Sequence, residues 1–246
     1  MALQEEFEKT GEYFFRWRSY LPLVMAVLFI LALAQFRYPF AHHGLDLAWD
    51  TGCLAVALLG QGVRFFTVGF VPRGTSGRNT RGQVADTLNT TGMYAVVRNP
   101  IYLGNFMIWF GLSLFMKSLW FSTIIILFFT IFYERIIFRE EGFLRQKFGD
   151  AFRQWAEATP AIIPQFRNWQ PPSLPFSWKS AIVREYGTFF AIIATFNVLE
   201  LLAGLFSSGR LALEPIWIKL FVGSAVIYLT VRYLKKKTKV LSTAGR

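Results

Sequence analysis

Repeated apolar runs, each close to the length that crosses a lipid bilayer, constrain this chain more than any other feature. A helix needs about 20 apolar residues to cross about 30 Å of hydrocarbon. We identify six such runs, of which the third is the shortest. They cover residues 19–36, 47–71, 101–116, 119–138, 187–206 and 214–234. Since backbone polar groups inside hydrocarbon must be satisfied internally, the sequence predicts an all-α polytopic membrane bundle of about six transmembrane helices.

The composition supports this fold class and argues against several others. Hydrophobic residues make up 54% of the chain and aromatic residues 18%, which is too apolar for a soluble domain of this size. The net charge of +11 suits anionic lipid headgroups, and no basic patch interleaved with aromatic residues indicates nucleic-acid binding. The single cysteine, Cys53, cannot form an internal disulfide, and we expect no metal site.

The runs and the polar segments between them divide the chain into four parts. We expect residues 1–18 to form an interfacial amphipathic helix. Residues 19–71 supply the first two transmembrane helices, and 72–165 form a core with a polar loop (72–92), a transmembrane hairpin and an amphipathic helix. Residues 166–246 supply a connector, the last two spans and a basic tail.

The distribution of cations predicts the orientation. Of 26 Lys and Arg residues, 21 fall in the terminal segments or the two long loops on one side. Arg37, Lys117 and Arg210 fall on the other side. By the positive-inside rule, both termini and the long loops face the cytoplasm, in the inner membrane if the source is bacterial.

Gln61 and Arg64 are the polar residues near the cytoplasmic end of the second run, and they share a helix face. Arg64 has two interpretations at this point: it extends its charge to the membrane surface, or it has a functional role.

The segment from Gly92 to Gly104 is the strongest functional signal. It places Tyr94, Arg98 and a Pro-x-Tyr-x-Gly sequence at the start of an apolar helix. A second polar cluster, Arg139-Glu140-Glu141, follows the fourth run. Because charges and helix breakers beside a span are unfavourable, the two clusters predict a polar ligand held at the membrane surface.

These two clusters, with Leu144, Phe148-Gly149 and a closing Ile163-Pro164, resemble the membrane methyltransferases of the isoprenylcysteine carboxyl methyltransferase and phospholipid methyltransferase type. The resemblance covers about residues 75–165. It implies that S-adenosylmethionine binds at the cytoplasmic surface and that a lipid-borne acceptor approaches from the bilayer.

The resemblance also implies a set of cofactor-binding residues by position. They are Asp86, Thr87, Leu88, Asn89, Tyr94, Asn99, Pro100, Ile101, Tyr102, Gly104, Glu140 and Glu141. Asn99 departs from the family, which usually has His there. An amide can donate and accept hydrogen bonds but cannot titrate, so an acid–base role at this position is in doubt.

The chemistry of these residue types agrees with the implied ligand. Glu140 could accept hydrogen bonds from the ammonium or ribose of the cofactor, and Arg98 could meet its carboxylate. Tyr94 and Tyr102 offer flat faces to adenine or to the sulfonium. For the acceptor, Arg135 and Arg139 are our candidates to hold an anionic oxygen, and with Arg98 they form the predicted catalytic set.

We therefore expect direct methyl transfer to a lipid acceptor. An anionic oxygen, on a lipid phosphate of the lipid A type or a prenylcysteine carboxylate, is favoured over a phospholipid amine, because both histidines lie in the opposite loop. Two alternatives remain open: an NADPH-dependent sterol or steroid reductase, against which Asn105 counts, and a non-catalytic transporter or scaffold. The acceptor and the oligomeric state stay undetermined.

Overall fold

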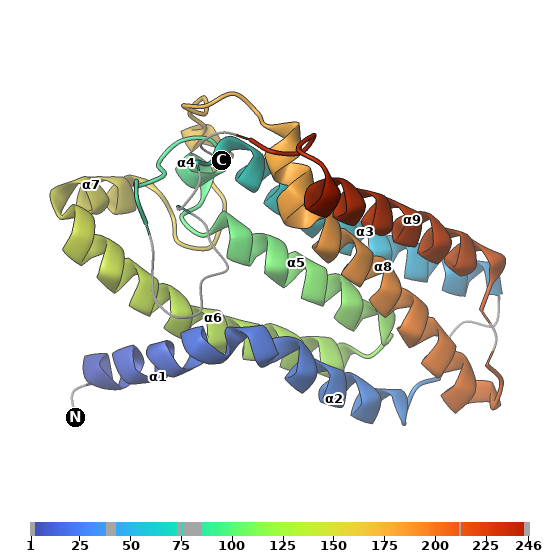
Figure 1. Ribbon diagram of the computed structural model, residues 1–246. Helices are drawn as coiled ribbons and strands as arrows, with labels where there is room; N and C mark the ends of the chain where they lie inside the picture. Colours follow the sequence, from blue (N-terminus) through green and yellow to red (C-terminus); the bar gives the residue numbers. More distant parts are fainter. Residues whose placement is uncertain (1–2, 38–42, 73–74, 76–84, 212, 244–246) are drawn as a thin grey trace.

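The described part of the chain is helical throughout and contains no strand (Figure 1). The computed structural model describes residues 3–37, 43–72, 75, 85–211 and 213–243. Of the predicted polar loop, residues 73–74 and 76–84 lie outside this part, as does His42. The helices are α1 (Leu3–Trp17), α2 (Leu21–Leu33), α3 (His43–Phe70), α4 (Met93–Val96), α5 (Pro100–Phe115), α6 (Leu119–Phe148), α7 (Asp150–Ala158), α8 (Trp178–Ser208) and α9 (Pro215–Lys237).

The lengths of these helices confirm a polytopic membrane bundle and revise its number of spans. Four helices, α3, α6, α8 and α9, are long and apolar enough to cross a membrane. The α1–α2 pair bends by 69° and counts as at most a fifth span. Helix α5 has 16 residues and so extends about 24 Å, short of about 30 Å. By length and composition, the described residues therefore contain four to five spans, where the sequence predicts about six.

Helix α3 is central to the packing. It contacts α5 along its length and also contacts α8, while α9 lies against the outer side of α8 (Figure 1). Helix α1 runs along α6 instead. Apolar side chains such as Phe115, Phe129 and Phe196 fill the space between the helices, as the apolar runs predict.

Small residues bring α3 and α5 into close contact. A Cβ added at Gly104 would lie 2.5 Å from Cγ of Arg64 and 2.7 Å from the carbonyl oxygen of Gly60. One added at Gly111 would lie 2.6 Å from the carbonyl oxygen of Cys53. Cys53 is itself buried and free. The short helix α5 is thus held tightly against the long helix α3.

The turn between α5 and α6 is fixed by buried ion pairs. Lys117 adopts a φ of 52°, and its ammonium lies 2.8 Å from Asp46 and 3.1 Å from Asp50 of α3. The Lys117 side chain is only 3% exposed, so removing its charge would leave the buried carboxylates of Asp46 and Asp50 without this counterion.

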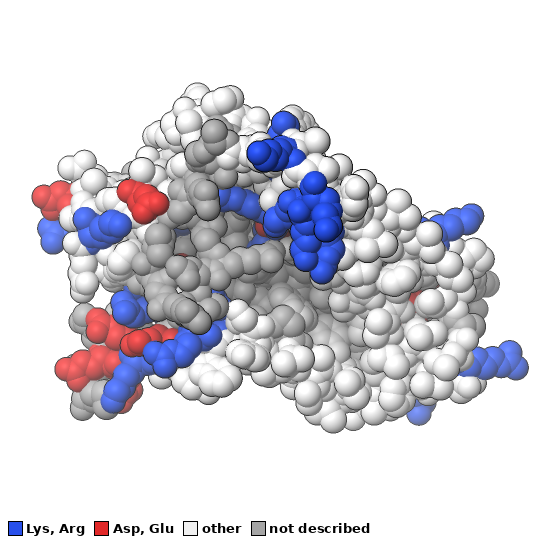
Figure 2. All heavy atoms as spheres, in the orientation of Figure 1, with Lys and Arg blue, Asp and Glu red and all other residues white. Residues whose placement is uncertain are grey.

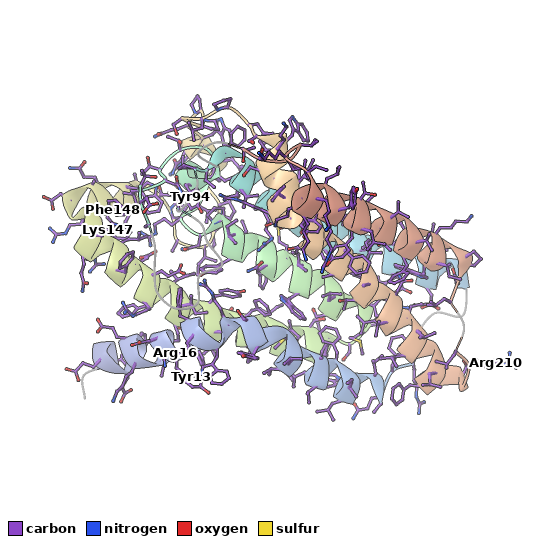
Figure 3. All side chains as sticks on the ribbon, in the orientation of Figure 1. Tyr13, Arg16, Tyr94, Lys147, Phe148 and Arg210 are labelled. Carbon is purple, nitrogen blue, oxygen red and sulfur yellow. The ribbon has the colours of Figure 1, made fainter. Side chains whose placement is uncertain are left out.

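Charged side chains gather at one end of the molecule. Figure 2 shows them over α1, α6 and α7 and near the C-terminal end of α9, with a broad uncharged surface beyond. We call the end that holds α4, α7 and the C-terminal part of α6 the site end. Arg210 lies at the opposite end from Tyr94 and Lys147 (Figure 3).

Gly104→Ala should lower the thermal unfolding temperature of the detergent-purified protein, because the new methyl group has to displace the backbone of Gly60. Overpacking of this kind costs about 1–3 kcal/mol. Gly62→Ala is the matched control. Gly62 lies on the same helix as Gly60, and a Cβ added there would have no neighbouring atom within 4 Å beyond its own helix backbone. Equal unfolding temperatures for the two variants would contradict the close packing of α3 and α5.

Candidate active site

The segment from Gly92 to Asn99 is held in place by the chain that follows α7. Gly92 has a φ of +62° and a ψ of −131°, a conformation that side chains disfavour strongly, and its N–H donates to the carbonyl of Gln170 at 2.9 Å. Farther along, the N–H of Gln165 donates to the carbonyl of Val96 at 3.0 Å. The glycine in the motif thus serves a backbone turn.

Arg98 and Asn99 bind the end of α7 as well. The Arg98 N–H donates to the carbonyl of Pro160 at 2.9 Å, and its Nη1 donates to the carbonyl of Ala156 at 2.8 Å. The Asn99 amide nitrogen donates to the carbonyl of Ala161 at 3.1 Å. An amide at this position therefore has a structural partner that needs no titratable group.

The two polar clusters predicted from the sequence meet at the start of α5. The Tyr102 hydroxyl donates to Oε1 of Glu140 at 2.7 Å. Nε of Arg98 lies 3.0 Å from Oε1 of Glu141. The adjacent glutamates of α6 therefore both face residues 98–102. This arrangement explains why two acidic residues stand side by side at the end of an apolar helix.

Arg18 adds a third group to the Tyr102–Glu140 contact. Its Nη1 lies 3.3 Å from Oε1 of Glu140 and 3.4 Å from the Tyr102 hydroxyl. Arg18 belongs to the short helical turn between α1 and α2, and its guanidinium lies 4.0 Å from the centre of the Phe15 ring. The side chains of Arg18 and Glu140 remain 18% and 26% exposed.

Tyr94 lies at the site end beside a hollow (Figure 3). The hollow is lined by Thr67, Phe70, Val71, Asn89, Thr91, Met93, Tyr94 and Ser173. Burial raises the pKa of the Tyr94 phenol above its ordinary value, and the negative charge of Glu140 adds to this, so the phenol stays protonated. Two predicted cofactor residues, Asn89 and Tyr94, thus share one concave surface.

The remaining predicted residues are distributed more widely. Asp86 and Thr87 are exposed and Leu88 is half-buried. Pro100 is buried in the first turn of α5, followed by half-buried Ile101. Gly104 faces α3, so its small size serves helix packing.

Arg135 and Arg139 lie where α6 meets α1. The Arg135 guanidinium is 3.3 Å from the centre of the Phe7 ring. A Cβ added at Gly11 of α1 would lie 3.0 Å from Cβ of Arg139. The structure therefore places both arginines beside the N-terminal helix, whereas Tyr102 and Glu140 face each other across α5 and α6.

A buried network lies beneath the Tyr102–Glu140 contact. Arg64 forms a bidentate pair with Glu185 of α8, with Nε–Oε2 and Nη2–Oε1 distances of 2.9 and 2.7 Å. Arg64 also donates to the side-chain oxygen of Asn105, whose nitrogen donates to the Tyr133 hydroxyl at 3.0 Å. The Tyr133 ring packs 4.6 Å from that of Tyr102, centre to centre. Arg64 is thus paired inside the bundle and does not extend to the membrane surface.

Comparison with known proteins identifies the region that contains this site. Residues 53–151 match the family model described as phospholipid methyltransferase. We call residues 53–151, which are 99 of the 246 residues, the matched region. The resemblance to membrane methyltransferases of this type, predicted from the sequence, is confirmed over this region, which includes α5, the two glutamates and Arg64.

Two relatives are similar over part of the chain. The nickel-cobalt-cadmium resistance protein NccN of Alcaligenes xylosoxydans xylosoxydans is 32% identical over 51% of this chain and 58% of its own length. The cobalt-zinc-cadmium resistance protein CzcN of Cupriavidus metallidurans is 30% identical over 61% of this chain and 65% of its own length. The matches thus cover less than two thirds of each relative. No solved structure matches the chain significantly.

Two contacts of the matched region were not predicted from the sequence. Arg18 and Glu185 both lie outside residues 53–151, yet one contacts Glu140 and the other pairs with Arg64. A charge within or beside an apolar run was the available signal in each case. Within the described residues, no three His, Cys, Asp or Glu side chains gather as a metal site.

Arg64→Gln should destabilise the protein strongly, because it leaves the 3% exposed Glu185 carboxylate without its counterion. Breaking a buried pair costs about 3–5 kcal/mol, and thermal unfolding in detergent would measure the loss. Arg153→Gln is the control, since Arg153 and Asp150 are 65% and 82% exposed and such pairs contribute little. A similar, small shift in both variants would refute the importance of the buried pair.

Proposed function

We propose that this protein is an S-adenosylmethionine-dependent methyltransferase that modifies a membrane-borne lipid at an anionic oxygen. The family match over residues 53–151 supports a membrane methyltransferase. The observation that carries the proposal is the 2.7 Å contact between Tyr102 and Glu140, since it joins the two sequence clusters that resemble the cofactor site of the family.

The residues present fit the chemistry of this cofactor. When bound, S-adenosylmethionine supplies an activated methyl group on a sulfonium cation. A partly exposed carboxylate, Glu140, suits the ammonium or ribose hydroxyls. The aromatic faces of Tyr94 and Tyr102 suit adenine or a cation, and Asn89 supplies an amide at the same hollow as Tyr94.

The task of the protein is then to orient groups and to exclude water. Tyr102 fixes the Glu140 carboxylate by donating to it. Arg98 is held by Glu141 and by the end of α7, which positions its charge beside the start of α5. Backbone hydrogen bonds with residues 160–170 also hold residues 92–98 in place. In our proposal, these contacts shape the cofactor site before the ligand binds.

We propose a lipid phosphate or a carboxylate as the acceptor, ahead of a phospholipid amine. An oxygen that is already ionised needs no general base. His43 begins α3, whereas Thr67 and Phe70, near the other end of this helix, line the hollow beside Tyr94. Arg135 and Arg139 remain our predicted cations for this group, together with Arg98. Their place beside α1 would require the acceptor to approach along the α1–α6 contact.

The proposed reaction also offers a link to the relatives named for metal resistance. Methylation of a phosphate oxygen removes negative charge from the headgroup. A membrane surface with less negative charge attracts divalent cations more weakly. In this proposal, the protein weakens the attraction of divalent cations to the membrane by altering the lipid surface. The site and both termini then lie on the cytoplasmic side, as the distribution of Lys and Arg predicts.

Glu140→Gln and Tyr102→Phe should each weaken S-adenosylmethionine binding by about tenfold, as expected for loss of a hydrogen bond to a charged group. Isothermal titration calorimetry on detergent-purified protein would measure the dissociation constants. Glu134→Gln is the control, because Glu134 is exposed on the same helix.

Several results of this titration would argue against the proposal. A wild-type protein that is folded yet binds no S-adenosylmethionine would overturn it. NADPH binding in its place would favour the reductase alternative, which the family match does not support. Wild-type affinity in both site variants would remove Glu140 and Tyr102 from the cofactor site.

A further inference from the structure

We infer that Arg18 binds the anionic headgroup of the acceptor lipid, at a subsite formed with Tyr102 and Glu140. This inference rests on the proposed methyltransferase function. It assigns a role in the reaction to a residue of the N-terminal segment, which lies outside the matched residues 53–151.

Arg18 lies at the position along the chain where a headgroup is expected. The preceding helix α1 carries acidic residues in its first turn and a basic residue in its last, whereas α2 after it has no charged residue at either end and is apolar throughout. The chain bends by 69° between them. A junction between an interfacial helix and an apolar helix lies near the level of lipid headgroups, so Arg18 can meet such a group without leaving the membrane surface.

The contacts of Arg18 allow an exchange of partners. Its Nη1 is 3.3 Å from Glu140 and 3.4 Å from Tyr102, longer than about 2.7–2.9 Å, the range of a strong charge-assisted hydrogen bond. By contrast, Tyr102 and Glu140 are 2.7 Å apart. A phosphate oxygen could therefore replace Glu140 as the partner of Arg18 while Tyr102 keeps Glu140 in place.

The guanidinium is positioned for this task by its stacking on Phe15 at 4.0 Å. Stacking orients the planar group through its face and uses none of the N–H donors at its edge, and Arg can bind phosphate through two such donors. Arg135 is stacked similarly, on Phe7, but at the contact between α1 and α6. Arg18 is the arginine that touches both Tyr102 and Glu140.

The opposite charges of Arg18 and Glu140 determine which ligand each residue suits. Glu140 suits the cationic methyl donor, and Arg18 suits the anionic acceptor, so binding of both ligands separates the Arg18–Glu140 pair and places the two ligands next to each other. On transfer, the acceptor oxygen forms a bond to the methyl carbon, the carbon–sulfur bond breaks, and its electron pair remains on sulfur. The oxygen loses its negative charge, so Arg18 holds the product less strongly than the acceptor.

The test is a titration of detergent-purified protein with dioleoyl phosphatidate, which carries a terminal phosphate, followed by native mass spectrometry. Wild type should bind phosphatidate more tightly than dioleoyl phosphatidylcholine. Arg18→Gln should weaken phosphatidate binding by about tenfold, and Arg18→Lys by less. Arg16→Gln is the matched control, because Arg16 of α1 is 70% exposed and pairs only loosely with Glu12, at 3.6 Å (Figure 3).

A second measurement uses the wild type alone and so does not depend on the folding of a variant. Sinefungin, a cationic analogue of the methyl donor that cannot transfer a methyl group, should engage Glu140 and release Arg18. It should therefore tighten phosphatidate binding several-fold, and phosphatidate should tighten sinefungin binding by the same factor.

Four results would overturn the inference. They are equal phosphatidate binding by wild type and Arg18→Gln, equal losses in Arg18→Gln and Arg16→Gln, absence of coupling although sinefungin binds, and complete displacement of the lipid by inorganic phosphate, which would make a free anion the ligand. Failure of the methyltransferase proposal is distinguishable: wild type would then bind phosphatidate through Arg18 but would bind neither S-adenosylmethionine nor sinefungin.

Discussion

The requirement that each charge inside an apolar bundle has a partner organises this structure. Taking an ion out of water costs several kcal/mol even after relaxation, so a buried charge fixes the helix that carries its counterion. Arg64 and Glu185 join α3 to α8, and Lys117 joins the α5–α6 turn to α3. At the site, Glu140 and Glu141 orient α6 toward α5. Close packing at Gly104 brings α5 near enough to α3 for Arg64 to contact Asn105.

The sequence predicted the fold class and the meeting of the two polar clusters, because both depend on local patterns. Apolar runs specify helices in a membrane whatever their neighbours are, and a Pro-x-Tyr-x-Gly start followed by a glutamate pair has a recognisable spacing. The number of spans was harder to predict from the sequence. Whether the 16 residues of α5 cross the membrane depends on its close contact with α3, and the bend between Tyr20 and Leu23 depends on how α1 packs against α6.

The partners of charged residues were the part that the sequence could not supply. Arg64 had two interpretations, and the structure gives a third, a buried pair with a residue on a distant helix. Gly104 fits the predicted motif spacing, yet its small size is required by Gly60 and Arg64 of the neighbouring helix. In both cases the deciding contact joins residues far apart in the chain, so the local pattern of apolar and polar residues does not predict it.

Because the chain is synthesised from its N-terminus, the backbone hydrogen bonds around residues 92–98 have a consequence for biogenesis. The backbone groups of Gly92, Val96 and Arg98 find their partners at Gln170, Gln165 and Pro160, so this turn cannot form on the ribosome until about 70 further residues have been made, at roughly 5–20 residues per second. The counterion of Arg64 is synthesised later still, because Glu185 belongs to α8. The first helices of the bundle are therefore made before the counterion of Arg64, and the arrival of α8 supplies it.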